Sequence, residues 1–308
     1  MGVVCFLFLC YNEVVKVKVF AKLNLTLNVG ARQGEFHPID SVATSVGICD
    51  VVQVLQRHDR QINVCGVNTV AQEQNTAYKA AVAFAQMFAK ISNATIGVDI
   101  SIEKGIPFGG GLGGSSADAA AVVYCMCKLF GVDIHSSEVH RLCSALGSDV
   151  NFMLFGGLGR MQGKGDDVTL YKMGKPLHFA LTTFDAGMNS GGIYSAFDKL
   201  ATTRYNTVNK SDNSILLNLL QQGATDKAIT LLSNDLQQAT LSVSNYASEY
   251  LRFVQSHNLS CNMTGSGSAY YVACDTSEKA EQVAKLLNFH GFTTTVCTSV
   301  PNGIVEIR

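Results

Sequence analysis

A dense glycine cluster followed at once by a helical segment is the feature that most constrains this chain. Residues 109–114 contain five glycines in six positions, and Ser115 and Ser116 follow them directly. The segment 115–130 is apolar and rich in alanine, which predicts a helix that ends before Gly131. Glycine permits positive φ values and close approach of the backbone to a ligand, and a helix N-terminus adds N–H donors and a positive dipole end. The pattern therefore predicts a polyphosphate site.

Two standard nucleotide motifs do not fit this cluster. A P-loop needs lysine after its last glycine, where this chain has Ser115. The dinucleotide pattern can be drawn through the glycines, but Asp133 follows a helix and a glycine and does not end a strand. A turn capped by serine is the structural alternative. If the cluster binds a polyphosphate, the hydroxyl of Ser116 is also a candidate Mg²⁺ ligand.

The rest of the chain predicts an α+β fold in two domains. Its 308 residues are 47% hydrophobic and 15% charged, enough to bury a sizeable core. We expect domains at 1–160 and 161–308, because a second series of strands and helices starts near residue 160, after an extended segment at 152–161. Periodicity predicts strands at 16–29, 96–102, 177–184, 269–274 and 293–298, and a turn followed by β segments over 34–56. It predicts helices at 75–91, 115–130, 136–147, 191–200, 212–221, 224–233, 243–257 and 277–290.

Charge and cysteine content narrow the class of protein. The formal net charge of −1 gives no basic excess for binding nucleic acid. The ten cysteines are irregularly spaced and include no C-x-x-C pair, which argues against a zinc site. We expect them to be buried thiols of a cytoplasmic protein.

The first ten residues are apolar but too short to span a bilayer, and they lack the positive start of a signal peptide. We expect an extra strand or an incidental extension there. No other stretch is apolar enough to span, so the sequence predicts a soluble protein with no membrane partner.

Three motifs, in order along the chain, resemble the signatures of the GHMP kinase superfamily, which includes galactokinase, homoserine kinase and mevalonate kinase. They are Phe20-Ala-Lys-Leu-Asn-Leu25, Pro107-Phe-Gly-Gly-Gly-Leu-Gly-Gly-Ser-Ser-Ala-Asp-Ala-Ala120 and Met263-Thr-Gly-Ser-Gly-Ser-Ala269. The resemblance implies a two-domain GHMP kinase fold with the active site in the cleft between the domains. It also implies ATP and Mg²⁺ as cofactors, a small-molecule alcohol as substrate, and a monomer or homodimer.

Within the superfamily, the chain most resembles the branch that phosphorylates a cytidine diphosphate-linked polyol in non-mevalonate isoprenoid synthesis. The matching segments are 34–37 (Gly-Glu-Phe-His), 75–80 (Asn-Thr-Ala-Tyr-Lys-Ala), 146–150 (Leu-Gly-Ser-Asp-Val), 163–166 (Gly-Lys-Gly-Asp) and 234–236 (Asn-Asp-Leu). The chain departs from that branch at Asn151, where proline is usual, and in its Ser-Ser-Ala loop, which is closer to mevalonate kinases. Another GHMP kinase, acting on mevalonate, homoserine or a sugar, and a non-catalytic relative remain as alternatives.

The resemblance also implies roles for residues on the nucleotide side. Asp149 would accept the proton of the attacking hydroxyl, and Lys22 would lie beside it. Asn75 and Lys104 would meet the adenine. The ATP phosphates and Mg²⁺ would be wrapped by the loop, which comprises Pro107, Gly109, Gly110, Gly111, Leu112, Gly113, Gly114, Ser115 and Ser116.

On the acceptor side, the resemblance places Phe36 and Tyr194 on the two faces of the pyrimidine. His37 would read the edge of the base, with Lys164 nearby, and Asn24 would touch the polyol. The substrate side would be closed by Gly265, Ser266 and Gly267.

Overall fold

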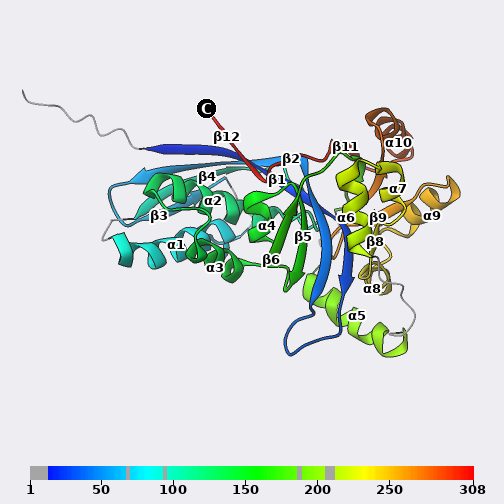
Figure 1. Cartoon of the computed structure of the whole chain (residues 1–308), viewed down its shortest axis with the longest axis horizontal. Helices are drawn as coiled ribbons and strands as arrows, with labels where there is room; N and C mark the ends of the chain where they lie inside the picture. The colour runs from blue at the N-terminus through cyan, green and yellow to red at the C-terminus, as the bar shows by residue number, and fades with distance from the viewer. Residues whose placement is uncertain (1–12, 67–69, 93–95, 186–188, 205–211) are drawn as a thin grey trace, which may run out of the picture.

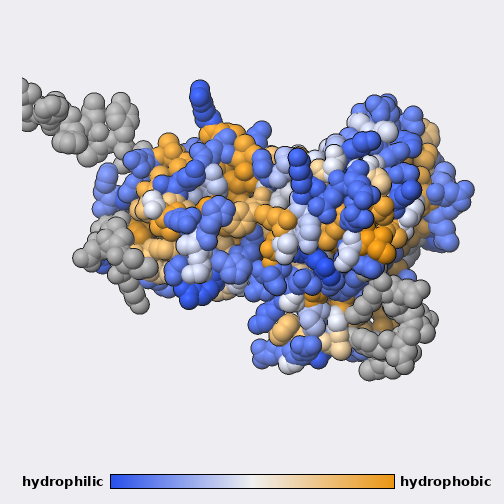
Figure 2. Space-filling view, viewed as in Figure 1, coloured by the Kyte–Doolittle hydropathy of each residue, from blue (hydrophilic) through white to orange (hydrophobic). Residues whose placement is uncertain are grey.

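The computed structural model describes residues 13–66, 70–92, 96–185, 189–204 and 212–308. The expectation for the apolar N-terminus therefore lies mostly outside the described residues. The molecule is elongated, and a large sheet extends along much of it, with helices beside this sheet in one half and a smaller sheet with further helices in the other (Figure 1). Polar and apolar residues are interspersed over the face seen in Figure 2. Within the described ranges, no helix is long and apolar enough to cross a membrane.

The larger sheet has eight strands in the order β12–β1–β2–β4–β3, with β5 and β6 continuing from β2 and β8 pairing with β1. The strands are β1 (Val14–Val29), β2 (Ile39–Arg57), β3 (Ile62–Cys65), β4 (Gly97–Glu103), β5 (Leu158–Gly163), β6 (Asp167–Tyr171), β8 (Ser233–Asn234) and β12 (Ile304–Ile307). The strands β1 and β2 run through much of the length of the molecule (Figure 1).

The strand predicted at 16–29 is confirmed as β1, but only its first half is half-buried. Lys18 is exposed between the buried Val17 and Val19, as alternation requires. From residue 21 to residue 29 every side chain is buried. Neighbouring elements cover both faces of the strand there, so its polar residues, including Lys22 and Asn24, are held inside the protein.

Helices α1 (Thr76–Ser92), α2 (Gly114–Phe130), α3 (Ser137–Leu146) and α4 (Val150–Phe155) accompany this sheet. The first three confirm the predicted helices. Helix α2 ends at Gly131, whose φ of 64° fits the left-handed conformation that glycine adopts at helix ends.

The extended segment expected at 152–161 is wrong in its first half, where α4 forms. An apolar run of this length has no period that separates helix from strand, and here the buried side chains of 152–154 pack into the core as a helical turn. Gly156 and Gly157, with φ of 63° and 77°, then turn the chain into β5.

The smaller sheet has four strands in the order β11–β7–β10–β9. They are β7 (His178–Thr182), β9 (Cys261–Met263), β10 (Tyr270–Cys274) and β11 (Thr294–Thr298). The helix expected at 243–257 begins later, as α9 at Ser248, and the sequence did not predict α8, which ends at Val243. The helix expected at 224–233 is only the five residues of α7. The helices of this part are α5 (Ser190–Arg204), α6 (Asn213–Gln222), α7 (Thr225–Ile229), α8 (Gln237–Val243), α9 (Ser248–Ser256) and α10 (Ser277–Phe289).

The chain crosses between the two halves more than once. The expected boundary at residues 160 and 161 falls inside β5, and β12 returns from the C-terminus to pair with β1 at 16–19. One core cluster also joins residues of both sheets, including Leu23 of β1 and Phe179 of β7. The division at 1–160 and 161–308 stays a prediction.

The cysteines mostly follow the prediction of buried thiols. Cys125, Cys127, Cys143, Cys274 and Cys297 are buried, whereas Cys65 is exposed. Burial raises the pKa of both Cys127 and Cys143 to about 12, which keeps these thiols protonated and unreactive.

Candidate active site

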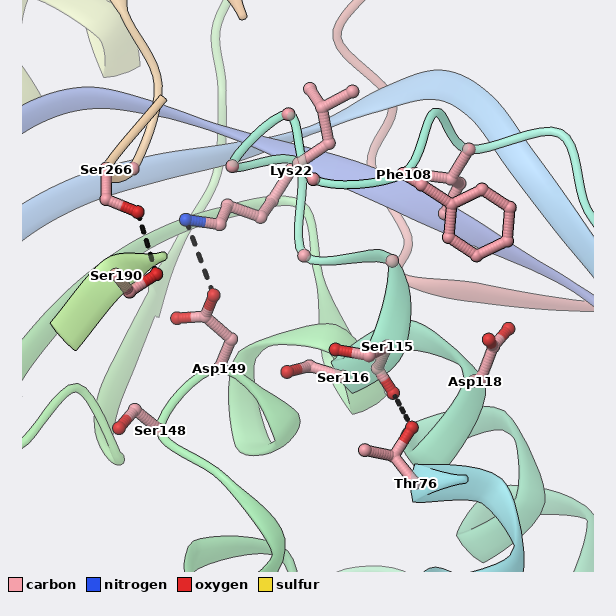
Figure 3. Close-up of a pocket in the computed structure, with 18 of the residues that line it drawn as sticks. Lys22, Thr76, Phe108, Ser115, Ser116, Asp118, Ser148, Asp149, Ser190 and Ser266 are labelled. Atoms are coloured by element: carbon pink, nitrogen blue, oxygen red, sulfur yellow. Dashed lines mark hydrogen bonds and ion pairs between the residues drawn. The ribbon is translucent and has the colours of Figure 1, made fainter. Parts of the chain in front are cut away.

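A cleft of about 600 Å³ is lined by residues from both ends of the chain (Figure 3). It brings together the N-terminal motif, the glycine loop and the C-terminal motif, so that Asn24 and Gly265, which are 241 residues apart in sequence, are in contact. All but three of the predicted site residues line it, namely Lys22, Asn24, Asn75, Lys104, Pro107, Gly109, Gly110, Gly111, Leu112, Gly113, Gly114, Ser115, Ser116, Asp149, Lys164, Tyr194, Gly265 and Ser266. The lining does not include Phe36, His37 or Gly267.

The glycine loop needs glycine at specific positions. Gly111 and Gly113 have φ of 74° and 76°, a region that residues with a side chain rarely adopt. A Cβ atom on Gly111 would lie 2.2 Å from the backbone oxygen of Thr264, and one on Gly113 would lie 2.0 Å from Cε of Met153. The loop is therefore closely packed against its neighbours and has a defined shape.

Backbone hydrogen bonds attach this loop to the other two motifs. The N–H of Lys22 donates to the Leu112 oxygen at 3.0 Å, and the N–H of Ala269 donates to the Gly110 oxygen at 3.1 Å. Gly113 is the N-cap of α2 and supplies no side-chain acceptor, so the N–H groups of the first turn of the helix are left for a ligand. The positive end of the α2 dipole lies at the same point.

Lys22 and Asp149 face each other across the cleft (Figure 3). Their Nζ and Oδ2 atoms are 3.4 Å apart, and the side chains are 5% and 28% exposed. Asp149 occupies the N-cap position of α4, but its carboxylate accepts no hydrogen bond from that helix. The carboxylate is therefore available to the cleft beside a buried ammonium group.

The side chain of Asn24 is engaged by the protein. Its Oδ1 accepts hydrogen bonds from Nζ of Lys22 at 2.5 Å and from the N–H of Gly265 at 2.9 Å. Its Nδ2 donates to the hydroxyl of Ser41 at 2.8 Å. Contact of Asn24 with the polyol stays a prediction. The structure shows a different contact of the same amide, which accepts the hydrogen bond of the Lys22 ammonium.

The ammonium group of Lys104 is held behind the loop by two carboxylates. It contacts Asp50, which is completely buried, and Asp118 at 2.8 Å. Asp50 also accepts the N–H groups of Gly105 and Ile106, so it fixes the entry to the loop. Burial raises the pKa of Asp118 to about 7, and the Asp50 carboxylate acts in the same direction while Lys104 opposes it.

Sequence reasoning missed both of these aspartates. Asp118 lies within the quoted loop motif, so its position next to two serines was a usable signal. Asp50 follows an apolar strand segment far from any motif, and nothing in the sequence marks it. Ser190 was missed as well, and its hydroxyl lies 2.8 Å from that of Ser266 at the edge of the cleft.

His37 lies behind the cleft lining, stacked on Tyr194. The two ring centroids are 5.4 Å apart with an interplanar angle of 24°, and Nε2 of His37 is 3.2 Å from Asp198. Burial raises the pKa of Tyr194 to about 12. The ammonium of Lys164 lies 4.8 Å from the centre of the Phe36 ring. Of the two aromatic residues predicted to bind the pyrimidine, Tyr194 lines the cleft and Phe36 does not, and their roles stay predictions.

The sequence and the fold match known proteins. Residues 75–157 match the family model for the GHMP kinases N terminal domain. The 4-diphosphocytidyl-2-C-methyl-D-erythritol kinase of Desulfitobacterium hafniense is 32% identical, over 91% of this chain and 95% of that protein. The enzyme of that name from Mycolicibacterium smegmatis is 31% identical, over 92% and 88%.

Solved structures share the fold. A crystal structure of 4-(cytidine 5'-diphospho)-2C-methyl-D-erythritol kinase superposes with a TM-score of 0.74 at 22% identity, covering 92% of this chain and 98% of that one. Homoserine kinase from Cytophaga hutchinsonii superposes with a TM-score of 0.71 at 14% identity, covering 97% and 99%. The predicted α+β GHMP kinase fold is confirmed.

Fold, cleft and family match together define a GHMP kinase. Within that superfamily, identity over nearly the whole length of its relatives shows that the chain belongs to the 4-diphosphocytidyl-2-C-methyl-D-erythritol kinase family.

Proposed function

We propose that this protein uses ATP to phosphorylate a hydroxyl group of 4-diphosphocytidyl-2-C-methyl-D-erythritol, a step of non-mevalonate isoprenoid synthesis, in the cytoplasm. The observation that carries the proposal is the Lys22–Asp149 pair at 3.4 Å in the same cleft as the glycine loop, in a chain of this family. Buried, unpaired thiols such as Cys127 and Cys143 are consistent with a reducing compartment.

The loop and the start of α2 would bind the phosphates of ATP. Backbone N–H groups supply hydrogen bonds without a lysine at the end of the loop, and the helix dipole favours the negative charge. Because the loop is attached by hydrogen bonds to β1 and to the 263–269 segment, the phosphates would be held next to Asp149. Phosphoryl transfer asks mainly for this kind of positioning and for charge stabilisation.

Asp149 would accept the proton of the attacking hydroxyl, and Lys22 would support it. The ammonium stabilises the negative charge of the carboxylate at 3.4 Å and is also placed to stabilise charge that develops on the entering oxygen. Burial of Lys22 strengthens both effects, since water screens the ammonium poorly there.

Mg²⁺ is the metal that ATP chemistry implies, and the cleft offers oxygen ligands that suit it. Hydroxyls of Ser115 and Ser116 and the carboxylate of Asp149 line the cleft. Among the described residues, no group of three or more histidine, cysteine, aspartate or glutamate side chains could hold a metal ion. This fits Mg²⁺, which usually takes one or two protein oxygens together with phosphates and water. When bound, it would neutralise charge on the phosphates.

At the acceptor end, Phe36, His37, Lys164 and Tyr194 would bind the cytidine group, while Gly265 and Ser266 would close the cleft. Two contacts support this proposal, since His37 stacks on Tyr194 and Lys164 lies over the ring of Phe36, and Tyr194 and Lys164 line the cleft. Aromatic faces suit a flat base, and a lysine suits the negative diphosphate.

A panel of acceptors tests the proposed function. ADP formation is measured with 4-diphosphocytidyl-2-C-methyl-D-erythritol, mevalonate and homoserine. We expect turnover with the first compound only, inhibited by free cytidine nucleotides in competition with the acceptor and not with ATP. Faster turnover with mevalonate or homoserine would overturn the assignment, and ATP binding without turnover of any alcohol would identify a non-catalytic relative.

A further inference from the structure

Ser41 lies on β2, behind the catalytic pair and outside the cleft lining. It is completely buried, and its hydroxyl has two neighbours. It donates to the backbone oxygen of Thr26, which can only accept, and it therefore offers a lone pair to Nδ2 of Asn24 at 2.8 Å. The direction of this hydrogen-bond chain is fixed by its end at a carbonyl group.

That direction determines which end of the Asn24 amide faces Lys22. With Nδ2 held by Ser41, Oδ1 points the other way and accepts from Nζ of Lys22 and from the N–H of Gly265. A turned amide would present N–H groups to two donors and would lose all three hydrogen bonds. The backbone of Asn24 is also fixed, since its oxygen accepts from the Tyr271 hydroxyl at 2.7 Å.

Lys22 in turn is held between two acceptors, Oδ1 of Asn24 at 2.5 Å and Oδ2 of Asp149 at 3.4 Å. A lysine side chain has four rotatable bonds, so without the amide oxygen its ammonium is less precisely placed. The same amide oxygen anchors Gly265, which belongs to the segment that closes onto the glycine loop.

From this geometry we infer that Ser41 is a positioning residue for phosphoryl transfer, because it holds the Asn24 amide in the one orientation that aims Lys22 at the reacting groups. The inference rests on the proposed function of the cleft. It concerns the rate of the chemical step and not the binding of ATP, since Ser41 does not touch the glycine loop.

The matched control is Ser45→Ala. Ser45 is also completely buried on β2, and its hydroxyl accepts a buried backbone N–H, that of Gly157, at 3.1 Å. Both serine-to-alanine changes remove an acceptor from a buried donor, and Ser41→Ala also removes the hydroxyl donor of the Thr26 oxygen, so its cost in stability should be somewhat larger. Both variants are therefore assayed at a temperature at which each is fully folded. Ser45 has no hydroxyl contact with Asn24 or Lys22, and we expect its alanine variant to keep wild-type kcat.

The test compares kcat and KM of wild type, Ser41→Ala, Ser41→Thr and Ser45→Ala. We expect Ser41→Ala to lower kcat about tenfold or more with KM for ATP nearly unchanged, and Ser41→Thr, which keeps the hydroxyl, to recover most of it. If Ser41→Ala does not fold, Ser41→Cys replaces it, since a thiol of similar size is only a weak acceptor. Equal kcat in the Ser41 and Ser45 alanine variants would overturn the inference.

A crystal structure of Ser41→Ala gives a readout that needs no substrate. We expect the Asn24 side chain, whose Nδ2 has lost its acceptor, to be less ordered, and the distance from Nζ of Lys22 to Oδ1 to exceed the 2.5 Å of the wild type. An unchanged Lys22–Asn24 contact would overturn the inference about Ser41, whichever acceptor the protein uses. Absence of turnover in the wild-type protein would instead count against the proposed function alone.

Discussion

At the scale of single residues, the site depends on charged groups that have been removed from water. Lys22 is 4% exposed, and burial of a lysine is unfavourable unless acceptors surround its ammonium. Here Asn24 and Asp149 supply them. Asp149 stabilises the buried cation and is also the proposed base, so substitutions of Asp149 should affect both stability and rate.

Asp149→Asn should leave ATP binding intact and reduce turnover by about a hundredfold or more, because the amide cannot accept the proton of the attacking hydroxyl. The checks are ATP affinity by calorimetry and steady-state turnover. Asp167→Asn is the control, since Asp167 is exposed on β6 and does not line the cleft. Unchanged turnover in Asp149→Asn would show that another group is the base.

Asp118 should make stability depend on pH. Burial raises its pKa in the folded protein to about 7 from an ordinary value of 3.8. The stability that this carboxyl group contributes is therefore complete below pH 4 and is lost as the pH rises through 7. The unfolding free energy of the wild type should therefore decrease between pH 4 and pH 7. Asp118→Asn has no carboxyl group to titrate at this position, so its unfolding free energy should rise relative to that of the wild type over the same range. Urea unfolding across this range, with Asp167→Asn as control, measures it. If the unfolding free energies of Asp118→Asn and wild type change with pH in parallel, the raised pKa is contradicted.

The sequence predicted the residues that lie in motifs and missed those that support them. Lys22 and Asp149 could be named because the family resemblance covers their segments. Asp50 and Ser41 could not, since a buried aspartate or serine on an apolar strand looks like any other polar residue until its partners are known. The hydrogen bonds that show their roles join segments far apart in sequence.

At the scale of elements, the glycine loop and α2 form one unit with β1 and the 263–269 segment. The helix was predictable from its composition and from glycine at both ends, because these are local signals. The short helix α4 was not, because its apolar run is compatible with helix or strand and packing against the core decides between them.

Gly113→Ala should reduce ATP affinity and stability more than Gly131→Ala. Both glycines have positive φ, 76° and 64°, so both variants incur similar backbone strain of about 1 kcal/mol. Only at Gly113 does the added Cβ also collide with Met153 and approach Lys22, whereas around Gly131 nothing lies within 4 Å.

Thermal unfolding and ATP titration of both variants test this comparison. Gly131→Ala, at the far end of α2, should bind ATP as the wild type does. Equal losses in the two variants would mean that the shape of the loop is not set by its contact with Met153 and Lys22.

At the scale of the whole molecule, the C-terminus completes the sheet that begins at the N-terminus. Strand β12 pairs with residues 16–19 of β1, and the N–H of Phe20 donates to the Gly303 oxygen at 2.9 Å. Because β1 continues from there to Lys22, residues 304–307 support the strand that carries the lysine of the cleft. The pairing of β12 with β1 joins residues from both predicted domains. Sequence periodicity could not predict β12, because four residues are too few to show a period.

Deletion of residues 304–308 should lower the unfolding free energy by about 2 kcal/mol or more, because four residues of backbone pairing are lost and β1 becomes an edge strand. Thermal unfolding and light scattering measure the loss and any self-association. Val305→Thr is the control, since this partly exposed residue can change without loss of the strand. A truncated protein as stable as wild type would show that β12 contributes little.

We propose that one cleft places the phosphates of ATP at the head of α2 and the acceptor hydroxyl at Asp149. A crystal structure with a non-hydrolysable ATP analogue and 4-diphosphocytidyl-2-C-methyl-D-erythritol tests it most directly. We predict the γ-phosphate on the backbone N–H groups of residues 109–116 and the acceptor hydroxyl within hydrogen-bonding distance of the Asp149 carboxylate. Phosphates bound away from this loop, or an acceptor hydroxyl far from Asp149, would contradict the account.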